Sequence, residues 1–533
     1  MFGRNLVPTK HFGELAVVAY HASADPWPRN YAEAMRRPDR AKWEVAMDRE
    51  LESIKDNDVW ELVPRPMNQK VVGALWVLKI KENGLYKARF CAKGYAQQWG
   101  IDFTDTFAPV AKYTSVRTLF AIAAGLGLKV HQMDVVTAFL YGHLEETVYV
   151  EQPEGYVEPG HENWVYLLKR ALYDLKQAPY AWYENIKAAL RGFEFVRCEM
   201  DHGIFVTTKN GHLVYLVVYV DDLLIMGERT KDIEEIKDQL KNRYKMKDLG
   251  IARRFLGMDI EYGEDGSIKL HLKQYLQGVL ERHNLQDCNS VSTPMDTSVK
   301  LVATTDADAL ADPKEYQQIV GEIQFAAVVA RPDVSCAVST LAQFNIKPSS
   351  KHLAAAKRVL RYLKGTVDAG VVYSPPAGEA TAFSDADWAG DQDSRRSRTG
   401  YVVMLNNGAI SWRSTLQQTV ALSTTESEYM ALTEACKEVE WIRELLKELR
   451  YGDHDIPTVL STDNQGALNL ALNPVSHGRT KHIAIRHHYI REKVADKTVW
   501  IQHIPTEIMT ADSLTKGLGR QKHARCAQLM GME

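Results

Sequence analysis

The chain of 533 residues lacks any apolar run long enough to cross a membrane. Its most apolar stretches are residues 119–128, which are too short, and residues 213–227, which contain an Asp-Asp pair. The N-terminal residues 1–22 lack the apolar centre of a secretory signal peptide. Together with a negative mean hydropathy, these absences predict a soluble protein that is neither secreted nor bound to a membrane.

Cysteines are few, and overall charge is nearly balanced. Six cysteines are scattered without a C-x-x-C pair, which argues against a zinc ribbon or knuckle and suits a reducing compartment. The net charge of −3 gives no sign of nucleic-acid binding. Residues 347–364 are the local exception, with six Lys or Arg and no acid. They predict a helix with Leu353, Leu360 and Leu363 inward, and taken alone they favour a solvated helix face.

The length predicts about three or four domains of ~150 residues each. Residues 1–25 show no sustained period and are predicted to be a leader or linker. A helical spacing of apolar residues follows at Trp43, Met47, Leu51 and Ile54. Residues 289–313 are polar, aperiodic and rich in Ser, Thr and Asp, which predicts an internal linker. Residues 374–378, Ser-Pro-Pro-Ala-Gly, predict a second break before a new α/β pattern.

Two adjacent aspartates, Asp221 and Asp222, interrupt one of the most apolar runs. Burying an unpaired carboxylate is costly, and neighbouring carboxylates also repel. Asn210-Gly211 predicts that the run is the second strand of a hairpin, so the pair lies near a turn. Because side chains alternate along a strand, we expect one aspartate to face a site and the other to support it.

A third aspartate, Asp134, ends a strand-like segment. If that strand lies beside the hairpin, Asp134 and Asp221 converge and offer oxygen ligands to paired Mg²⁺ ions, which assist in-line phosphoryl transfer. The alternative is that Asp134 is a strand-end residue and the Asp pair a simple turn, since Asp favours turns. For Asp134 alone the alternative is favoured. For the pair it is weaker, because both flanks are strongly apolar.

Several motifs resemble those of copia-type LTR retrotransposon Pol polyproteins, in their reverse transcriptase and ribonuclease H region. Tyr-Val-Asp-Asp at 219–222 resembles the reverse transcriptase palm. The wider resemblance runs from about residue 26 to the C-terminus and includes WEVAMDRELESI, MDVVTAFLYGHLEETVYVEQPEGY, ALYDLKQAPYAWYE, FLGMDI, IVGEIQFAAVVARPDVSCAVS and AAAKRVLRYLKGT. It implies an α+β fold, a right-hand-like polymerase with fingers, palm and thumb or connection parts, followed by a ribonuclease H-like α/β domain. The implied domains are 26–246 (fingers and palm), 247–375 (thumb or connection) and 376–533 (ribonuclease H).

The resemblance also implies roles for single residues. Asp134, Asp221 and the Val135 carbonyl would bind metal, with Asp222 in support. Phe139 would exclude a 2′-hydroxyl, and Gln177 would lie beneath the incoming nucleotide. The predicted primer-gripping hairpin is formed by Leu256, Gly257 and Met258.

A predicted hairpin over residues 74–95, with its turn at residues 82–84, supplies candidate triphosphate contacts. These are the cations Lys79, Lys81, Lys87 and Arg89. For any one of them, a solvated hairpin face is an equal alternative.

Four further acids follow residue 376. Asp385 lies in a strand-like segment, and Glu428 is in phase with the apolar stripe of a long helix. Each acid also has a local explanation: Thr425-x-x-Glu428 fits a capping box, and helix capping is the ordinary role for Asp463 and Asp512. Their order resembles the ribonuclease H family, which implies a two-metal hydrolytic site made by all four.

Residues 479–492 are typical of the same group. Their His482, His487 and His488 suggest a zinc site, but no cysteine or acid spacing supports one. The resemblance favours nucleic-acid or structural roles for these histidines. No protease-like Asp-Ser/Thr-Gly site, integrase-type zinc motif or zinc knuckle is present, so we expect the C-terminal part of a longer polyprotein or a truncated copy.

The sequence departs from the family pattern at a few positions. Asp174 and Tyr180 stand where Gly and Arg are usual, Val136 where Lys is common, and Gly517 where Pro is usual. Of these, Asp174 and Tyr180 lie near the expected nucleotide pocket and bear on polymerase efficiency.

The resulting hypothesis is an RNA-directed DNA polymerase with a ribonuclease H. It would use two Mg²⁺ ions per site, with Mn²⁺ as the alternative. Its partners would be an RNA template, a DNA primer, an RNA–DNA hybrid, deoxynucleoside triphosphates and other polyprotein products. We expect it in cytoplasmic element particles, in the nucleus, or in both. The alternative is a polymerase-impaired or domesticated remnant that acts as a nuclease or nucleic-acid-binding protein only.

Overall fold

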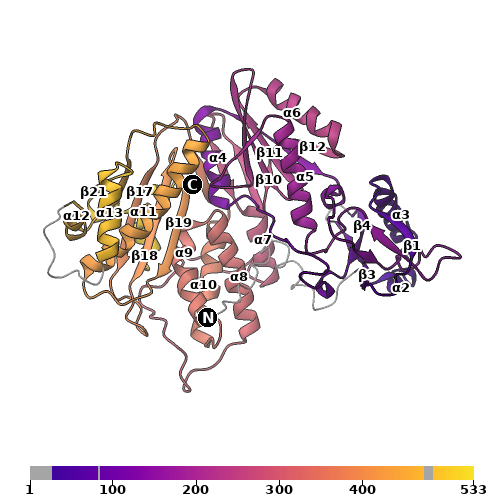
Figure 1. Cartoon of the computed structure of the whole chain (residues 1–533). Coiled ribbons are helices and arrows are strands. Elements are labelled where there is room, and N and C mark those ends of the chain that lie inside the picture. Colours follow the sequence, from indigo (N-terminus) through magenta and orange to yellow (C-terminus); the bar gives the residue numbers. More distant parts are fainter. Residues whose placement is uncertain (1–26, 82–83, 473–483) are drawn as a thin grey trace. The chain divides into compact units, whose positions relative to one another are not determined.

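The structure, a computed structural model of the chain, describes residues 27–81, 84–472 and 484–533, the last range without the side chains of residues 484–487 (Figure 1). The predicted leader 1–25, residues 82–83 of the predicted hairpin turn, His482 and the side chain of His487 lie outside the described residues. Among the described helices, none has the length and apolar character needed to cross a bilayer. All six cysteines are free.

The chain forms two compact units with α and β elements in both. Unit 1 comprises residues up to Pro109 and Val135–Gly192, and unit 2 comprises Val110–Asp134 and Phe193–Glu533. The division into these two units does not coincide with the domain boundaries predicted from the sequence. Unit 2 contains all seven acids that the sequence singles out.

Unit 1 packs helices against two small sheets. Its main helix, α3 (Arg40–Asp56), buries Trp43, Met47 and Ile54 completely, which confirms the predicted helical spacing. The strands form a sheet of order β1-β7-β6-β2 and the separate hairpin β3–β4. The elements are α2 (Tyr31–Met35), β1 (Trp60–Pro64), β2 (Val71–Val72), β3 (Ala74–Ile80), β4 (Tyr86–Ala92), η2 (Ala138–Tyr141), β6 (Tyr149–Val150), β7 (Trp164–Leu168) and α5 (Ala178–Gly192).

Unit 2 begins with a six-stranded sheet of order β12-β5-β11-β10-β9-β8. Its two central strands, β10 and β11, are the predicted apolar hairpin, and their side chains are almost all buried. The elements are α4 (Tyr113–Leu126), β5 (Lys129–Val135), β8 (Val196–Arg197), β9 (Ile204–Lys209), β10 (His212–Tyr219), β11 (Asp222–Gly227), α6 (Thr230–Arg243) and β12 (Met246–Ile251).

A helical region with a four-stranded sheet follows. The predicted basic helix is α10 (Ser350–Gly365), which buries Leu360 and Leu363 and partly buries Leu353. The predicted linker 289–313 contains no helix or named strand before Pro313, where α8 begins. The other elements are β13 (Arg254–Phe255), β14 (Met258–Tyr262), β15 (Ile268–His271), α7 (Lys273–Arg282), α8 (Pro313–Val329), η3 (Pro332–Val334), α9 (Ser335–Leu341), η4 (Ala342–Phe344) and β16 (Gly370–Tyr373).

The last region is a five-stranded sheet of order β19-β18-β17-β20-β21 (Figure 1). Strands β17, β18 and β19 are antiparallel, whereas β17, β20 and β21 are parallel. The elements are β17 (Thr381–Asp387), β18 (Arg398–Leu405), β19 (Gly408–Leu416), α11 (Thr424–Glu448), β20 (Thr458–Thr462), α12 (Gln465–Leu472), α13 (Ala484–Ala495), β21 (Val499–His503), η7 (Thr510–Leu514) and α14 (Arg520–Leu529).

One buried arginine joins three of these regions within unit 2. Arg117 on α4 is 4% exposed and donates to Ile410 O at 2.8 Å, Val328 O at 2.7 Å and Val329 O at 2.9 Å. Its guanidinium also lies 3.9 Å from the Trp412 ring centre. The Arg117 side chain on α4 therefore donates hydrogen bonds to the carbonyls at the end of α8 and on β19 that α4 covers.

We expect Arg117→Met to lower the free energy of unfolding by about 2–4 kcal/mol, because it leaves buried carbonyls without a donor. Denaturant unfolding followed by fluorescence measures the change. Arg243→Met, at an exposed position on α6, is the control and should change stability by less than about 0.5 kcal/mol. Equal effects of the two substitutions would contradict the assigned role.

Candidate active sites

Asp221 and Asp222 lie where β10 turns into β11. Tyr219 pairs with Asp222, so Val220 and Asp221 alone form the connection. Val220 has φ 57°, in the left-handed region that two-residue hairpin turns use. A β-branched residue there is strained by about 1–3 kcal/mol. The flanking strand pairs must therefore hold the turn against the residue's own preference.

Strand β5 lies beside β11, as predicted, and its register places Asp134 directly opposite Asp222. Residues directly opposite across antiparallel strands share one face of the sheet. Asp134 and Asp222 thus project from the same face, with Asp221 in the adjoining turn. Direct metal binding by Asp221 and support by Asp222 stay predictions.

Asp222 is half-buried beside negative charge. Burial raises its pKa to about 6, and the charges of Asp221 and Asp134 act in the same direction. The Gln132 amide donates to Asp222 Oδ1 at 3.3 Å and acts in the opposite direction. Three carboxylates at one end of a sheet offer the oxygen ligands that Mg²⁺ requires, and a bound cation would offset their repulsion. The residues present therefore fit a divalent cation.

The predicted primer-gripping hairpin has a tight turn. Leu256 and Gly257 alone join β13 to β14, and both have positive φ, 50° and 82°, as in a type I′ turn. Tyr113, the first residue of α4, donates from its hydroxyl to Leu256 O at 3.4 Å. This contact fixes the turn to α4, whereas contact of Leu256, Gly257 or Met258 with a primer stays a prediction.

In unit 1, three of the four candidate triphosphate contacts share a face of the β3–β4 hairpin. Lys79 lies directly opposite Lys87, and Arg89 is two positions along the same strand as Lys87. Lys79 is exposed, and the Arg89 guanidinium lies 5.1 Å from the Tyr173 ring centre. Lys81 lies beyond the end of β3 and is exposed. The shared face suits an anion, but the triphosphate contact stays a prediction.

The other predicted nucleotide contacts also belong to unit 1. Val135 is the last residue of β5, and the ring of Phe139 packs edge-on against Tyr173 at 5.8 Å. Gln177 is buried: its amide nitrogen donates to Asp102 O at 2.9 Å, and its oxygen accepts from Gln97 at 3.0 Å. A nucleotide contact through Gln177 would have to replace one of these bonds, and all three roles stay predictions.

Asp174 shows why glycine is usual at its position. Its φ is 65°, in the region that glycine adopts without cost and other residues adopt with strain. The adjacent backbone is also crowded, because a Cβ on Gly94 would lie 1.9 Å from Asp174 O. Tyr180 lies in the first turn of α5 and is half-buried. Asp174 thus adds strain to unit 1, and Tyr180 supplies no cation there.

The second group of acids forms a compact cluster. Asp385 near the end of β17, Glu428 on α11 and Asp463 directly after β20 bring their ligand oxygens within 4.8 Å of one another. Parallel pairing of β17 with β20 sets the two strand ends side by side. Within the described part of the chain, no other group of three or more His, Cys, Asp or Glu side chains is this close.

Glu428 shows that this cluster fits a metal ion. Glu428 is 6% exposed, and its Oε2 has no hydrogen-bond partner in the described structure. Burial, with the charges of Asp385 and Asp463 acting in the same direction, raises the pKa of Glu428 to about 10. Burial likewise raises the pKa of Asp385 to about 6. A divalent cation with oxygen ligands would satisfy this orphaned atom and offset the shared charge.

The local explanations for Glu428 and Asp463 are wrong. Ser423 caps α11 by accepting from the Glu426 amide at 3.2 Å. Asn464 takes the equivalent place at α12, because its side-chain oxygen accepts from a helix amide at 2.9 Å. Neither Glu428 nor Asp463 is therefore needed as a cap, so capping does not account for their convergence.

Asp512 lies apart from the three clustered acids. It is fully buried within η7, so it does not cap the C-terminal helix α14. Lys516 Nζ lies 2.5 Å from Asp512 Oδ1 and 3.6 Å from Asp385 Oδ2, and Lys522 pairs with Asp512 Oδ2. Lysines thus supply the counter-charge for Asp512. Metal binding by Asp512 would require Lys516 to move and stays a prediction.

Several supporting side chains were not predicted from the sequence. The Thr515 hydroxyl donates to Asp385 Oδ2, and the Thr506 hydroxyl donates to Asp463 Oδ2 at 2.7 Å. Asp512 and Lys516 are four residues apart, a spacing that brings opposite charges together on one helical turn. That spacing was the one available signal, since single hydroxyl residues have no recognisable pattern. His488, from the predicted histidine group, is exposed on α13.

Comparisons with known proteins agree with these observations. Residues 57–297 match the family model described as reverse transcriptase (RNA-dependent DNA polymerase). The chain is 40% identical over 523 residues to the Retrovirus-related Pol polyprotein from transposon TNT 1-94 of Nicotiana tabacum, which covers 96% of this chain and 39% of that protein. It is 39% identical over 524 residues to the corresponding polyprotein from transposon RE1 of Arabidopsis thaliana, with 97% and 35% covered.

A shorter relative is matched over its whole length. The chain is 36% identical over 309 residues to the putative transposon Ty5-1 protein of Saccharomyces cerevisiae, which covers 58% of this chain and 100% of that protein. By contrast, the chain spans less than two fifths of the RE1 polyprotein and about two fifths of the TNT 1-94 polyprotein.

The raised pKa of Glu428 predicts a pH-dependent stability in the absence of metal. The folded state binds a proton that the unfolded state releases above its ordinary pKa of 4.5, so the free energy of unfolding should fall as pH rises toward the folded-state pKa of about 10. In chelator near pH 8, Glu428→Gln should therefore be more stable than the unsubstituted protein by about 1–3 kcal/mol.

Adding Mg²⁺ should reverse that order, because only the protein with Glu428 keeps the complete ligand set. Denaturant unfolding at two pH values, with chelator and with Mg²⁺, measures both effects. Lower stability of Glu428→Gln in chelator would show that the carboxylate is not the unfavourable charge assumed here.

Proposed function

The chain belongs to the reverse transcriptase family of copia-type retrotransposon Pol polyproteins, and from this premise we propose that it is an RNA-directed DNA polymerase joined to a ribonuclease H. The six-stranded sheet serves as the palm and unit 1 as the fingers. The helices and four-stranded sheet between residues 247 and 375 serve as thumb or connection. The five-stranded sheet with its helices is the ribonuclease H domain, and its three antiparallel and two added parallel strands support this assignment.

The polymerase proposal depends on one observation: Asp134 and Asp222 face each other across β5 and β11, beside Asp221 in the turn. The three carboxylates would hold divalent cations, which activate a primer 3′-hydroxyl and offset charge on the nucleotide triphosphate. Gln132 orients Asp222 through its amide. The strained Val220 turn and the apolar strands keep the carboxylates in place, so that the hydroxyl attacks the α-phosphate and pyrophosphate leaves.

The nuclease proposal depends on the Asp385–Glu428–Asp463 cluster. These residues would hold a cation that activates water and stabilises the departing 3′-oxygen. Thr515 and Thr506 orient Asp385 and Asp463 through hydroxyl hydrogen bonds. The proposed substrate is the RNA strand of an RNA–DNA hybrid, with Mg²⁺ or Mn²⁺ as the ion.

A second candidate is a protein whose nuclease alone is active. It is favoured by the strain at Asp174, with φ 65°, and by the close approach of three ligands, which among the described residues occurs in the nuclease cluster alone. A remnant that only binds nucleic acid is the less favoured form of this candidate. We place the protein in cytoplasmic element particles, the nucleus, or both, with a template, primer, deoxynucleoside triphosphates and other polyprotein products as partners.

We expect primer extension on an RNA template with Mg²⁺, and a loss of at least about 100-fold in Asp221→Asn, because a ligand of the metal is removed. Incorporation of labelled deoxynucleotide measures the loss. Asp238→Asn, an exposed residue on α6, is the matched control and should keep full activity. Equal incorporation by the protein with Asp221 and the Asp221→Asn variant would refute the polymerase assignment.

Hydrolysis of a labelled RNA–DNA hybrid should likewise fall by at least about 100-fold in Asp385→Asn, while primer extension continues. Asp455→Asn, at an exposed loop position, serves as the control. Hydrolysis with absent extension would favour the second candidate, whereas hydrolysis unaffected by Asp385→Asn would place the nuclease activity elsewhere.

A further inference from the structure

The cations of the basic segment 347–364 all have partners inside unit 2. Five of them contact the irregular segment that precedes α8, and Lys357 pairs with Glu315 on α8 at 2.7 Å. The five are Lys347 with Asp306 at 3.4 Å, Lys351 with Asp308 at 3.2 Å, Arg358 with Asp296 at 3.4 Å, Arg361 with Asn289 O at 2.7 Å and Lys364 with Cys288 O at 2.5 Å. The predicted solvated face is thus paired with other parts of the chain, although Lys347 and Lys351 remain largely exposed.

We call residues 288–312 the strap. It runs along the basic segment in the opposite direction, because its first residues contact the end of α10 and Asp306 and Asp308 contact the beginning of the basic segment. It contains four aspartates and one lysine. Because it runs antiparallel to the basic segment and carries a net negative charge, the strap forms an acidic cover along the row of cations.

The hold of the strap on α10 is mostly polar. Thr293 and Pro294 are buried, but no side chain between residues 295 and 310, a stretch that the structure describes completely, is buried. The side chains of Asp306 and Lys347 are largely exposed, as is that of Lys351. Exposed ion pairs contribute little net stability, so another anion can replace the strap carboxylates at small cost.

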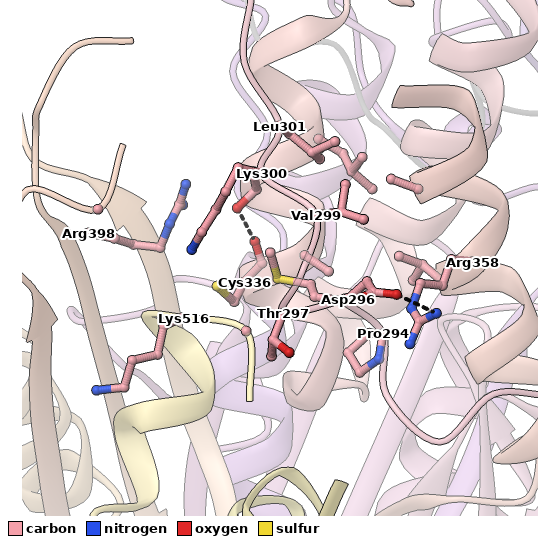
Figure 2. A pocket seen from close by; sticks show the side chains of 18 of the residues that line it. Pro294, Asp296, Thr297, Val299, Lys300, Leu301, Cys336, Arg358, Arg398 and Lys516 are labelled. Atoms are coloured by element: carbon pink, nitrogen blue, oxygen red, sulfur yellow. Dashed lines mark hydrogen bonds and ion pairs between the residues drawn. The ribbon is translucent and has the colours of Figure 1, made fainter. Parts of the chain in front are cut away.

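Space already exists beneath the strap. A cavity of about 660 Å³ lies between the strap, α9, α10 and the ends of β17 and β18 in the five-stranded sheet. Figure 2 shows Lys300, Arg358, Arg398 and Lys516 around it, with the Asp296–Arg358 ion pair spanning its rim. Lys516 also pairs with Asp385 and Asp512. The cavity therefore leads from the basic helix to the proposed nuclease site.

We propose that the strap is a displaceable acidic cover over a nucleic-acid-binding face of α10, and that backbone phosphates of an RNA–DNA hybrid replace Asp296, Asp306 and Asp308. The inference rests on the proposed function and adds where the hybrid binds and what competes with it. Phosphates accept from Arg and Lys as carboxylates do, and a polyanion gains further from released counterions. The strap residues between 295 and 308 then leave the helix, whereas Thr293 and Pro294 remain anchored at one end. At the other end, Ala309 and Ala311 remain anchored by backbone hydrogen bonds to Ser350 and Pro348.

The test removes charge from the strap without changing its shape. Asp296→Asn, Asp306→Asn and Asp308→Asn are combined in one protein, and affinity for a labelled RNA–DNA hybrid is measured by anisotropy in chelator, where hydrolysis does not occur. The control combines Asp238→Asn, Asp265→Asn and Asp455→Asn at exposed positions elsewhere in unit 2, which changes net charge by the same amount.

We expect the strap variant to bind about ten-fold more tightly, because less competing charge must be displaced from the phosphate-binding face, and the control to change affinity less than about two-fold. In a Lys351→Gln/Arg358→Gln background, affinity should fall, its salt dependence should weaken by about 1–2 in log–log slope, and the strap substitutions should have no further effect.

Three results would overturn the proposal. Equal tightening by strap and control variants would show a general charge effect, and an unchanged strap variant would show that the cover does not compete. Persistence of the strap effect without Lys351 and Arg358 would place binding elsewhere. If the unsubstituted protein binds no hybrid, both the proposed function and the proposal about the strap are refuted. If it binds the hybrid and the strap variant has the same affinity, only the proposal about the strap is refuted.

Discussion

Carboxylates packed at the ends of apolar strands need positive charge, and both candidate sites are arranged around that requirement. In the six-stranded sheet, Asp222 is half-buried, and burial and two neighbouring aspartates raise its pKa. In the five-stranded sheet, Glu428 carries an orphaned oxygen between two other acids. Apolar strands make these geometries rigid, but they also remove the water that would otherwise stabilise the charges. A metal ion is the simplest group that meets both conditions.

The two sites meet the requirement differently in the protein alone. In the six-stranded sheet, the neutral amide of Gln132 donates to Asp222. The five-stranded sheet supplies a lysine, since Lys516 reaches both Asp385 and Asp512. The acids of the five-stranded sheet thus have part of their counter-charge in the chain itself. The strap repeats the principle with reversed sign, because its aspartates pair with lysines and an arginine of the basic segment.

Local patterns predicted much of the fold, whereas the acids were assigned to the two candidate sites through the family resemblance. Periodic apolar residues located α3 and α10, and the apolar run around Asp221 and Asp222 located a hairpin whose neighbour β5 carries Asp134. Spacing failed where a role depends on residues distant in sequence. It offered capping as an equal explanation for Glu428, since the competing cap at Ser423 becomes visible only with hydrogen bonds. It treated the basic helix as solvated, because nothing local shows that a polar linker folds back over it.

Helix α4 contacts the four-stranded and the five-stranded sheet within about one turn. Its first residue, Tyr113, is bonded to the turn of the β13–β14 hairpin, and Arg117, four residues later, is bonded to β19. Such a short rigid segment, about 6 Å along the helix axis, leaves little slack between them. On the proposed function, movement of the primer hairpin as the duplex advances would directly move the five-stranded sheet of the proposed nuclease. Synthesis and cleavage would then be mechanically coupled through one turn of helix rather than through a flexible linker.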